Sequence, residues 1–592
     1  KVPNNNYKPR FEDPRVGYFT TQVTDLTSPD DPTPYRDLIH RWHLEKKNPE
    51  QERSEVKEPI VWWIENTTPH EFREAIKEGA LAWNTAFEKA GLINAVEVKI
   101  QPDDAKWDAG DIRYNVLRWT SSPNPPFGGY GPSFVNPRTG QILGADIMLE
   151  YVYFTNRVKY EKLYETFTDS QNGQSKKHNC LAGEYIQQGN FFGKLASGSI
   201  GNYSELEQHR IIYESLVRLT LHEIGHTHGL NHNFASSYLH SFNNIHDRHI
   251  TEPVGLTSSV MEYPAVNVGV GSNSHGQFYT TVPGPYDNWA IQFGYTPSLK
   301  NPEDERERVE KLLSQSTKPE LLFGNDSDDM RSPGRGMDPR MMIYDLSDDP
   351  VAYAQQRMDI VRSLYPKLRS RYEVKGSSYH SFKDAFYILN REYSQSANII
   401  SRQIGGVYID RSMIGEEGKE EPFVPVPKDQ QKWAMTLLSK YIFSPEAFDT
   451  PDGIFNYLQS ERRGLSGTKD PNLLDMYLNM QKNIFNHLLN IKVMKRISNV
   501  ELYGNKYSLS EVLKDLTTAC FSSDAGSNVN SMRRNLQVEY AKRLIQVVHN
   551  KGKSKYDHLA VAIAYENLNS VKKYASRFNG VDEPTKAHRK YL

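Results

Sequence analysis

Four short segments in the first part of the chain have the apolar pattern of β-strands. They are residues 60–64, 96–100, 111–119 and 141–150. The first reads Ile-Val-Trp-Trp-Ile, a run of β-branched and aromatic residues that is typical of a buried strand. In the last, Leu143, Ala145, Ile147 and Leu149 alternate with more polar neighbours, which predicts that these four residues face a core on one side of a half-buried strand.

Helical periodicity appears between the first two predicted strands. Apolar residues recur at helical spacing from Phe72 to Phe87, which predicts an amphipathic helix that ends near Gly91. Thr68 and Glu71 have the spacing of a capping box, in which each side chain bonds a free amide at the start of the helix.

A second predicted helix follows the fourth strand. Ser204 and Glu207 again have capping-box spacing, and apolar residues continue at helical intervals to about His228. Residues from about 152 to 203 are polar and show little periodicity, so they are interpreted as an insertion. The order of strand, helix, three strands and helix favours a mixed sheet covered by helices.

The rest of the chain divides into two further parts. Residues 1–58 are rich in Pro, Asn and Asp and predict an irregular N-terminal arm. Beyond about Tyr295 the strand signals become rare, and residues 299–592 are predicted to be mostly helical. The expected fold class is therefore α+β with several domains, and residues 59–298 hold the sheet.

Composition excludes some classes of protein. Charged residues make up 24% of the 592 residues and the net charge is -2, so no basic surface for nucleic acid is expected. No apolar run is long enough for a transmembrane helix. Cys180 and Cys520 are too few for a disulfide framework, and two unpaired buried thiols are expected rather than a bridge. Because the chain begins at Lys1, we expect any targeting segment to lie outside it.

The second predicted helix carries the residues that indicate chemistry. His222 and His226 lie four residues apart, so a helix presents both on one face, where their imidazoles can bind one metal ion. Glu223 is next to the first of them and can act as a general base without binding the metal. Gly229 permits the turn that ends the helix and brings His232 back as a third ligand. Three neutral ligands leave one position open for water, as a catalytic zinc site requires.

This longer pattern is far more specific than a pair of histidines on a helix. The shorter pattern, His222 to His226, arises by chance in roughly a few chains per hundred, whereas adding Gly229 and His232 lowers this to on the order of one in ten thousand. The alternative is a helix whose histidines have only structural roles. The full pattern is the signature of metzincin peptidases, and the chain resembles that clan.

A second segment carries the same resemblance. Ser258 to Pro264 reads Ser-Ser-Val-Met-Glu-Tyr-Pro and resembles the Met-turn, whose methionine lies beneath the zinc ligands in metzincins. The resemblance implies that Met261 has this structural role and that Tyr263 is either a displaceable fifth ligand, which also stabilises the oxyanion, or an ordinary, partly buried tyrosine. It also implies a twisted, mostly parallel sheet in residues 59–298.

Within this clan, the chain most resembles the bacterial Met-zincin family of envelope zinc peptidases. Short stretches shared with that family are Gly131–Ser133, Pro137–Gly140 and Pro422–Pro427. The resemblance implies a protein or peptide substrate, one catalytic zinc ion and a location outside the cytoplasm, in the periplasm, at the outer membrane or secreted. The oligomeric state cannot be read from the sequence.

Two further segments match features of metzincins, and one residue departs from them. Residues 286–292 resemble the last helix of the catalytic domain, and the strand 141–150 is expected at the cleft edge of the sheet, where a peptide would add as another strand. His228 stands where the family pattern has a bulky apolar residue. It either lies near the site as an additional titrating group or is a surface or core histidine without function.

Other polar clusters are less specific. His246 and His249 could form a second metal site, but a loop that happens to contain two histidines is the default interpretation. The acidic run Asp326 to Asp329 could bind calcium, but a solvated loop is the default interpretation.

The predicted function is zinc-dependent endopeptidase activity. Zinc would lower the pKa of a water from near 16 to about 7, and Glu223 would take its proton and pass it to the leaving amine. Two alternatives stay open. One is a zinc hydrolase of a non-peptide amide, and the other is a catalytically idle surface protein with a vestigial zinc site.

Overall fold

A computed structural model describes most of the chain. The described residues are 5–27, 33–122, 129–154, 182–200, 205–269, 276–418, 421–462, 464–465, 467, 470–550, 555–577 and 581–592. Cys180, the predicted cap residue Ser204 and residues 155–181 of the predicted insertion lie outside this part.

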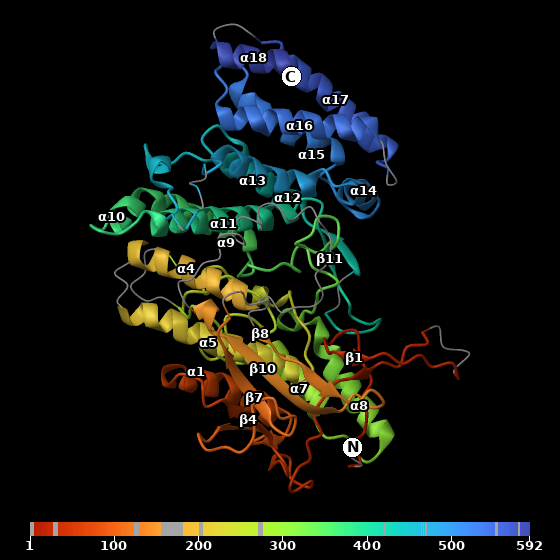
Figure 1. Cartoon of the computed structure of the whole chain (residues 1–592). Coiled ribbons are helices and arrows are strands. Elements are labelled where there is room, and N and C mark those ends of the chain that lie inside the picture. The colour runs from red at the N-terminus through yellow and green to blue at the C-terminus, as the bar shows by residue number, and fades with distance from the viewer. Residues whose placement is uncertain are drawn as a thin grey trace.

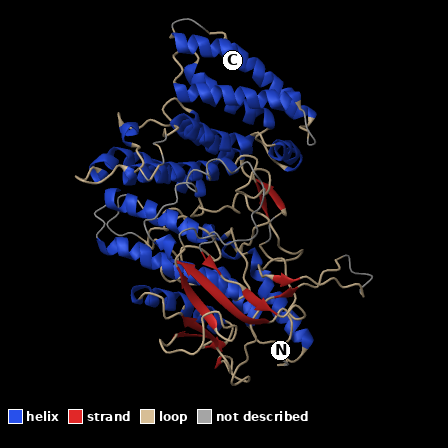
Figure 2. Ribbon diagram, viewed as in Figure 1, coloured by secondary structure: helices blue, strands red, loops and turns tan. Residues whose placement is uncertain are grey.

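A six-stranded sheet forms the lower part of the molecule as drawn in Figure 2. Its strands, in spatial order, are β6 (Val96–Ile100), β4 (Ile60–Ile64), β7 (Asn115–Thr120), β10 (Ile142–Glu150) and β8 (Gly129–Tyr130), with β9 (Ser133–Val135) also on β10. The first four are parallel to their neighbours, and β8 and β9 run antiparallel to β10. A mixed, mostly parallel sheet is therefore confirmed.

The predicted place of the fourth strand in the sheet was wrong. Strand β10 is not at the edge, because β7 pairs with one side of it and β8 and β9 pair with the other. The predicted facing of Leu143 was also wrong, since 42% of this residue is exposed. The pairing of β9 with β10 shifts register between Ile142 and Gly144, and this bulge turns Leu143 outward while Ile142 is buried.

Two helices, α1 (His70–Leu81) and α5 (Glu205–Thr227), lie side by side against one face of the sheet. Gly79 allows their close approach, because a Cβ atom there would be 2.8 Å from the carbonyl oxygen of Val217. The indole of Trp83 is fully buried and donates a hydrogen bond of 3.1 Å to the carbonyl oxygen of Leu221.

The predicted helix over residues 68–91 is present as two helices, α1 and α2 (Asn84–Lys89). The interruption is slight, because Ala82 and Trp83 both keep right-handed helical backbone angles. The predicted capping box does not form. Pro69 is the N-cap residue, so Glu71 lies one position before the place from which a capping-box glutamate reaches back.

The predicted arm also contains regular pairing. Strand β1 (Thr20–Thr21) pairs with β2 (Leu38–Ile39), and β3 (Ser54–Glu55) pairs with β5 (Leu92–Ile93). The hydroxyl of buried Tyr18 donates to the carbonyl oxygen of Ala290 at 2.7 Å. The indole of Trp42 donates to the carbonyl oxygen of Thr227 at 2.8 Å. These contacts join the arm to the helices behind the sheet.

Part of the predicted insertion is a helix. Residues 182–200 form α4 (Ala182–Ile200), which packs against α5 and against the later helices α9 (Pro350–Leu364) and α11 (His380–Arg402). Gly189 lies where a Cβ atom would be 2.5 Å from the hydroxyl oxygen of Tyr279, and Gly193 faces Ile211 and Val266 at contact distance. Because glycines hold these contact positions, the sequence of α4 shows no clear apolar stripe.

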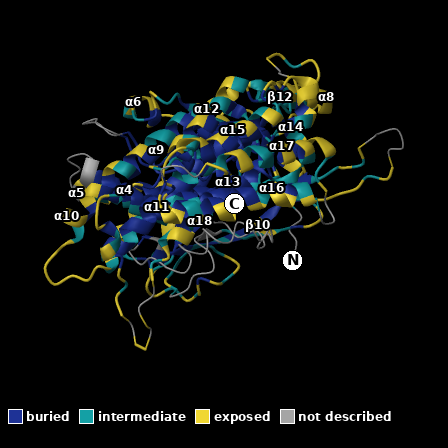
Figure 3. Cartoon of the chain, turned by 90° about the horizontal axis from the view of Figure 1, so that it is seen from above, coloured by how far each residue is buried: buried dark blue, intermediate teal, exposed yellow. Residues whose placement is uncertain are grey.

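The C-terminal region is mostly helical, as predicted. Above α4 in Figure 1 lie α9 and α11, then the remaining helices in successive layers. These are α12 (Lys428–Leu438), α13 (Leu473–Leu488), α14 (Ile491–Val500), α15 (Leu509–Phe521), α16 (Ser531–His549), α17 (His558–Ala575) and α18 (Glu583–Tyr591). One small ribbon of β11 (Val407–Ile409) and β12 (Phe423–Pro425) interrupts them. Seen from above in Figure 3, the helices of the C-terminal region are buried on their inner faces and exposed on their outer faces.

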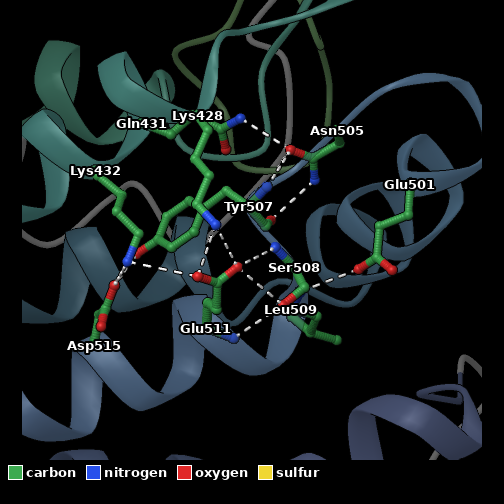
Figure 4. Close-up of polar contacts among 10 residues, drawn as sticks. All are labelled: Lys428, Gln431, Lys432, Glu501, Asn505, Tyr507, Ser508, Leu509, Glu511 and Asp515. Carbon is green, nitrogen blue, oxygen red and sulfur yellow. Dashed lines mark hydrogen bonds and ion pairs between the residues drawn. The ribbon is translucent and has the colours of Figure 1, made fainter.

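Helix α15 illustrates how these layers are joined. Ser508 and Glu511 form a capping box at its start, and Lys428 of α12 reaches the Glu511 carboxylate at 2.9 Å (Figure 4). Cys520, near the end of α15, is a buried free thiol, as expected for this residue. No helix within the described ranges has the length and apolar character needed to cross a bilayer.

Candidate metal centre

The predicted ligands come together at the C-terminal end of α5. One ring nitrogen from each of His222, His226 and His232 lies within 4.8 Å of the corresponding atoms of the other two. No other group of three or more His, Cys, Asp or Glu side chains with this geometry occurs among the described residues. His222 and His226 are on one helix face, and His232 returns to them after the helix has ended.

Each of the three imidazoles is oriented by a hydrogen bond from Nδ1. The acceptors are the carbonyl oxygen of Val260 for His222 at 2.8 Å, that of Leu230 for His226 at 2.9 Å, and Oδ2 of Asp326 for His232 at 2.7 Å. Because these oxygens accept, each Nδ1 carries the proton and each Nε2 has its lone pair available for a metal.

Burial keeps the first two imidazoles neutral. It lowers the pKa of His222 well below its usual value and lowers the pKa of His226 to about 3, with the neighbouring imidazoles adding to the effect. Glu223 is fully buried beside His222. The site therefore combines three uncharged nitrogen ligands with one adjacent carboxyl group.

Gly229 makes the turn after α5 possible. Its φ of 94° is in the left-handed region that favours glycine. The turn is also paired with the arm, since the amide of Phe19 donates to the carbonyl oxygen of Gly229 at 2.7 Å. The ring of Phe19 then lies against His226, with the ring centroids 5.6 Å apart. No pattern in the sequence indicated that the arm reaches the site.

Met261 packs beneath the helix between the first two histidines. It is fully buried, and a Cβ atom on Gly225 would overlap its sulfur atom. Asp287 of α7 (Pro285–Tyr295) shapes the segment that leads to Met261, accepting from the hydroxyl of Ser259 at 2.6 Å and from the amide of Val260 at 2.8 Å. Residues 286–292 therefore contribute Asp287 to the support of this turn, a role that the sequence did not identify.

Tyr263 lies beside the third ligand. Its hydroxyl is 2.6 Å from Nε2 of His232, the nitrogen that is available for a metal. The ring of Tyr185, from α4, stacks on the Tyr263 ring with a centroid separation of 5.6 Å. Tyr185 was missed because it lies in the segment interpreted as a polar insertion.

The acidic segment after α8 (Pro302–Leu313) is engaged with neighbouring side chains. Asp326 accepts from His232, Asp328 pairs with Arg411 at 2.6 Å, and Asp329 pairs with Arg331 at 2.7 Å. The default interpretation of a solvated loop is therefore wrong for Asp329, whose side chain is 3% exposed, whereas Asp326 stays partly solvated at 41% exposure although it has a specific partner. Calcium binding here stays without support.

The other histidines lie apart from the three ligands. His228 is in the core, where its ring meets the edges of Trp83 and Phe87 at centroid distances of 5.0 Å, and burial lowers its pKa to about 3. This agrees with the simpler interpretation of a core histidine. His249 is exposed, and within the described residues it joins no cluster of metal ligands.

The donor set fits a zinc ion. Nε2 of His222 is buried and has no hydrogen-bond partner among the described residues, which is the arrangement expected of a ligand atom. Three imidazole nitrogens with oriented Nδ1 atoms are typical of catalytic zinc sites.

The fold and these three histidines are those of a metzincin-type zinc metallopeptidase. A family model described as Met-zincin matches residues 205–528, more than half of the chain, so the chain belongs to the Met-zincin family. A second model, described as a domain of unknown function, matches residues 1–47. No curated protein sequence and no solved structure matches the chain.

Proposed function

We propose that the protein is a zinc-dependent endopeptidase in which His222, His226 and His232 hold the metal and Glu223 is the general base. The observation that carries this proposal is the convergence of three imidazole nitrogens within 4.8 Å, next to a buried carboxyl group. A zinc ion bound there supplies Lewis acidity, which lowers the pKa of a water to about 7 and polarises a carbonyl group.

The protein's own groups have distinct roles in the proposed reaction. Glu223 takes a proton from the attacking water and gives it to the leaving amine nitrogen, a form of catalysis typically worth about 10²–10⁴-fold. The hydroxyl of Tyr263 donates to the oxygen that becomes negatively charged as water adds to the carbonyl carbon. Support for this role is the position of the hydroxyl, 2.6 Å from Nε2 of His232.

The peptide is proposed to bind along the outer edge of β8 and β9. These strands occupy the edge of the sheet that had been expected for β10. β8 also lies against the active-site helix α5, and a Cβ atom on Gly131, the residue after β8, would be 3.0 Å from the carbonyl oxygen of Glu223. An extended substrate could pair there through its main chain. We also propose that the protein is located outside the cytoplasm, as its resemblance to the Met-zincin family implies.

The test combines metal analysis with cleavage of a mixed peptide library. We expect one zinc ion per chain, cleavage that disappears with phenanthroline, and recovery when zinc is added back. Glu223→Gln should keep zinc and lose turnover, whereas Glu71→Gln, on an exposed face of α1, should behave as the parent. Normal turnover in Glu223→Gln would reject the assigned base. Bound zinc without any peptide cleavage would favour a non-peptide substrate or the idle protein.

A further inference from the structure

One of the three candidate ligands is oriented by a charged side chain from a distant part of the chain. Oδ2 of Asp326 accepts from Nδ1 of His232 at 2.7 Å, although the two residues are 94 positions apart. His222 and His226 instead donate to main-chain carbonyl groups. Asp326 also lies beyond residue 298, where the catalytic region predicted from the sequence ends.

The segment that carries Asp326 is attached directly to the residues after His232. The side-chain amide of Asn233 donates to the carbonyl oxygen of Leu322 at 3.0 Å and accepts from the amide of Gly324 at 3.2 Å. The amide of Phe234 donates to the carbonyl oxygen of Gly324 at 2.7 Å. These three bonds keep the segment beside the third ligand.

A residue of the C-terminal region holds the other side of this segment. Arg411, which follows β11, donates to the carbonyl oxygen of Phe323 at 2.7 Å and to the carboxylate of Asp328 at 2.6 Å. Asp328 in turn accepts from the amide of Asn325 at 3.1 Å. The main chain on both sides of Asp326 is therefore held by contacts within the protein.

We propose that Asp326 is a positioning residue for the metal centre, and that the C-terminal region thereby completes the site. The carboxylate holds His232 in the tautomer whose Nε2 carries no proton and, as a charged acceptor, increases the basicity of that nitrogen. The side chain of Asp326 is 41% exposed and that of His232 is 14% exposed, so the carboxylate acts through His232 from the solvent side of the site. The inference rests on the proposed metal site, although not on the identity of the substrate.

The experiment measures zinc affinity in the full-length chain by competition with a chromophoric chelator. We expect Asp326→Ala to weaken zinc binding about 10–100-fold, as outer-shell partners of metal ligands do. Asp326→Asn should weaken it less, because the carboxamide oxygen still accepts from Nδ1 without carrying charge. Ser327→Ala is the matched control, since Ser327 is exposed and its hydroxyl bonds Asn325 within the same turn, and the zinc affinity of this variant should equal that of the parent.

Thermal unfolding of each metal-free variant separates positioning from a structural role. The proposal requires weaker zinc binding at an unchanged melting temperature. Zinc affinity in Asp326→Ala within twofold of the parent would overturn it, as would an equal loss of affinity in Ser327→Ala. If Asp326→Ala does not fold, the zinc affinity of Asp326→Asn, which conserves the shape of the side chain, tests the proposal instead. A parent that binds zinc but cleaves no peptide would reject the peptidase and leave this comparison valid, whereas a parent that binds no zinc would reject both.

Discussion

Gly229 lies so close to the main chain of His40 that a Cβ atom on Gly229 would overlap the carbonyl oxygen of His40. The turn that brings His232 back to the other ligands is therefore closed by the N-terminal arm. The amide of His40 in turn donates to the carbonyl oxygen of Phe19 at 2.8 Å. The arm and the third ligand are thus parts of one packed unit.

Gly229→Ala should strongly destabilise the protein. Alanine is strained at a positive φ, and its Cβ atom would overlap the carbonyl oxygen of His40. A loss of about 2–4 kcal/mol in the free energy of unfolding is therefore expected. Urea denaturation followed by circular dichroism measures this loss. Gly376→Ala is the matched control, because Gly376 has a φ of 89° and no atom of the described residues lies within 4 Å of its Cβ position, and it should lose only about 1 kcal/mol. Equal losses in the two variants would show that contact with the arm is unimportant.

The first two ligands could be predicted because their relationship is local. The i, i+4 spacing of His222 and His226 places them on one face of any helix, and Gly229 marks the end of that helix in the sequence itself. The strands β4 and β6 were likewise found from their own composition, with the predicted bounds. In each case the information lies within a few neighbouring residues.

The remainder of the site depends on contacts between residues that are far apart in the sequence, and no local pattern predicts such contacts. Asp326 is 94 positions from His232, and its neighbours are those of an ordinary acidic loop. The interior place of β10 depends on which strands pair beside it, and alternation within one strand does not specify that order. Tyr185 was missed because glycines replace apolar residues at contact positions of α4.

Tyr263→Phe should reduce turnover while zinc remains bound. Phenylalanine keeps the stacking on Tyr185 but lacks the hydroxyl that lies 2.6 Å from Nε2 of His232. If this hydroxyl stabilises the developing oxyanion, kcat should fall by about 10²–10³-fold with little change in KM. Steady-state kinetics on a cleaved peptide, together with zinc analysis, measure both quantities.

Tyr213→Phe provides the control for this substitution. Tyr213 is on the same helix as His222, and its hydroxyl bonds Glu78 on the outer surface. It should have the kinetics of the parent. Full activity in Tyr263→Phe would leave Tyr263 as an ordinary buried tyrosine.

Removing one charge of the ion pair between Arg357 and Glu392 should strongly destabilise the protein. Both side chains are buried, at 0% and 1% exposure, and Arg357 also donates to the carbonyl oxygen of Val266 at 2.7 Å. Glu392→Gln leaves the buried guanidinium without a counter-charge, and a loss of about 3–5 kcal/mol is expected. The measurement is the urea midpoint of the variant against the parent.

Replacing both partners separates the charge effect from packing. The double variant Arg357→Met, Glu392→Leu removes both buried charges and should be more stable than Glu392→Gln alone. Glu373→Gln, which breaks the exposed pair with Arg369, should change stability by less than about 1 kcal/mol. A similarly small effect of Glu392→Gln would mean that solvent or another group neutralises Arg357.

His588 of α18 should make the C-terminal helices sensitive to acid. Its Nε2 donates to the side-chain oxygen of Gln537 at 2.8 Å. Burial lowers the pKa of His588 to about 4, and the positive charges of Arg534 and Arg589 add to this. In the unfolded chain the pKa is near 6.5, so below that pH the unfolded state takes up a proton that the folded state does not. The stabilisation is present above pH 6.5 and is lost as the pH falls toward 4.

His588→Gln should therefore flatten the decline in melting temperature between pH 6.5 and 4.5, since glutamine can donate to Gln537 but does not titrate. Other buried histidines titrate alike in parent and variant, so the difference between the two curves isolates His588. His549→Gln, at an exposed position on α16, is the control and should leave the slope of the parent unchanged. A slope in His588→Gln as steep as that of the parent would show that His588 accepts its proton within the folded protein and that the acid sensitivity arises elsewhere.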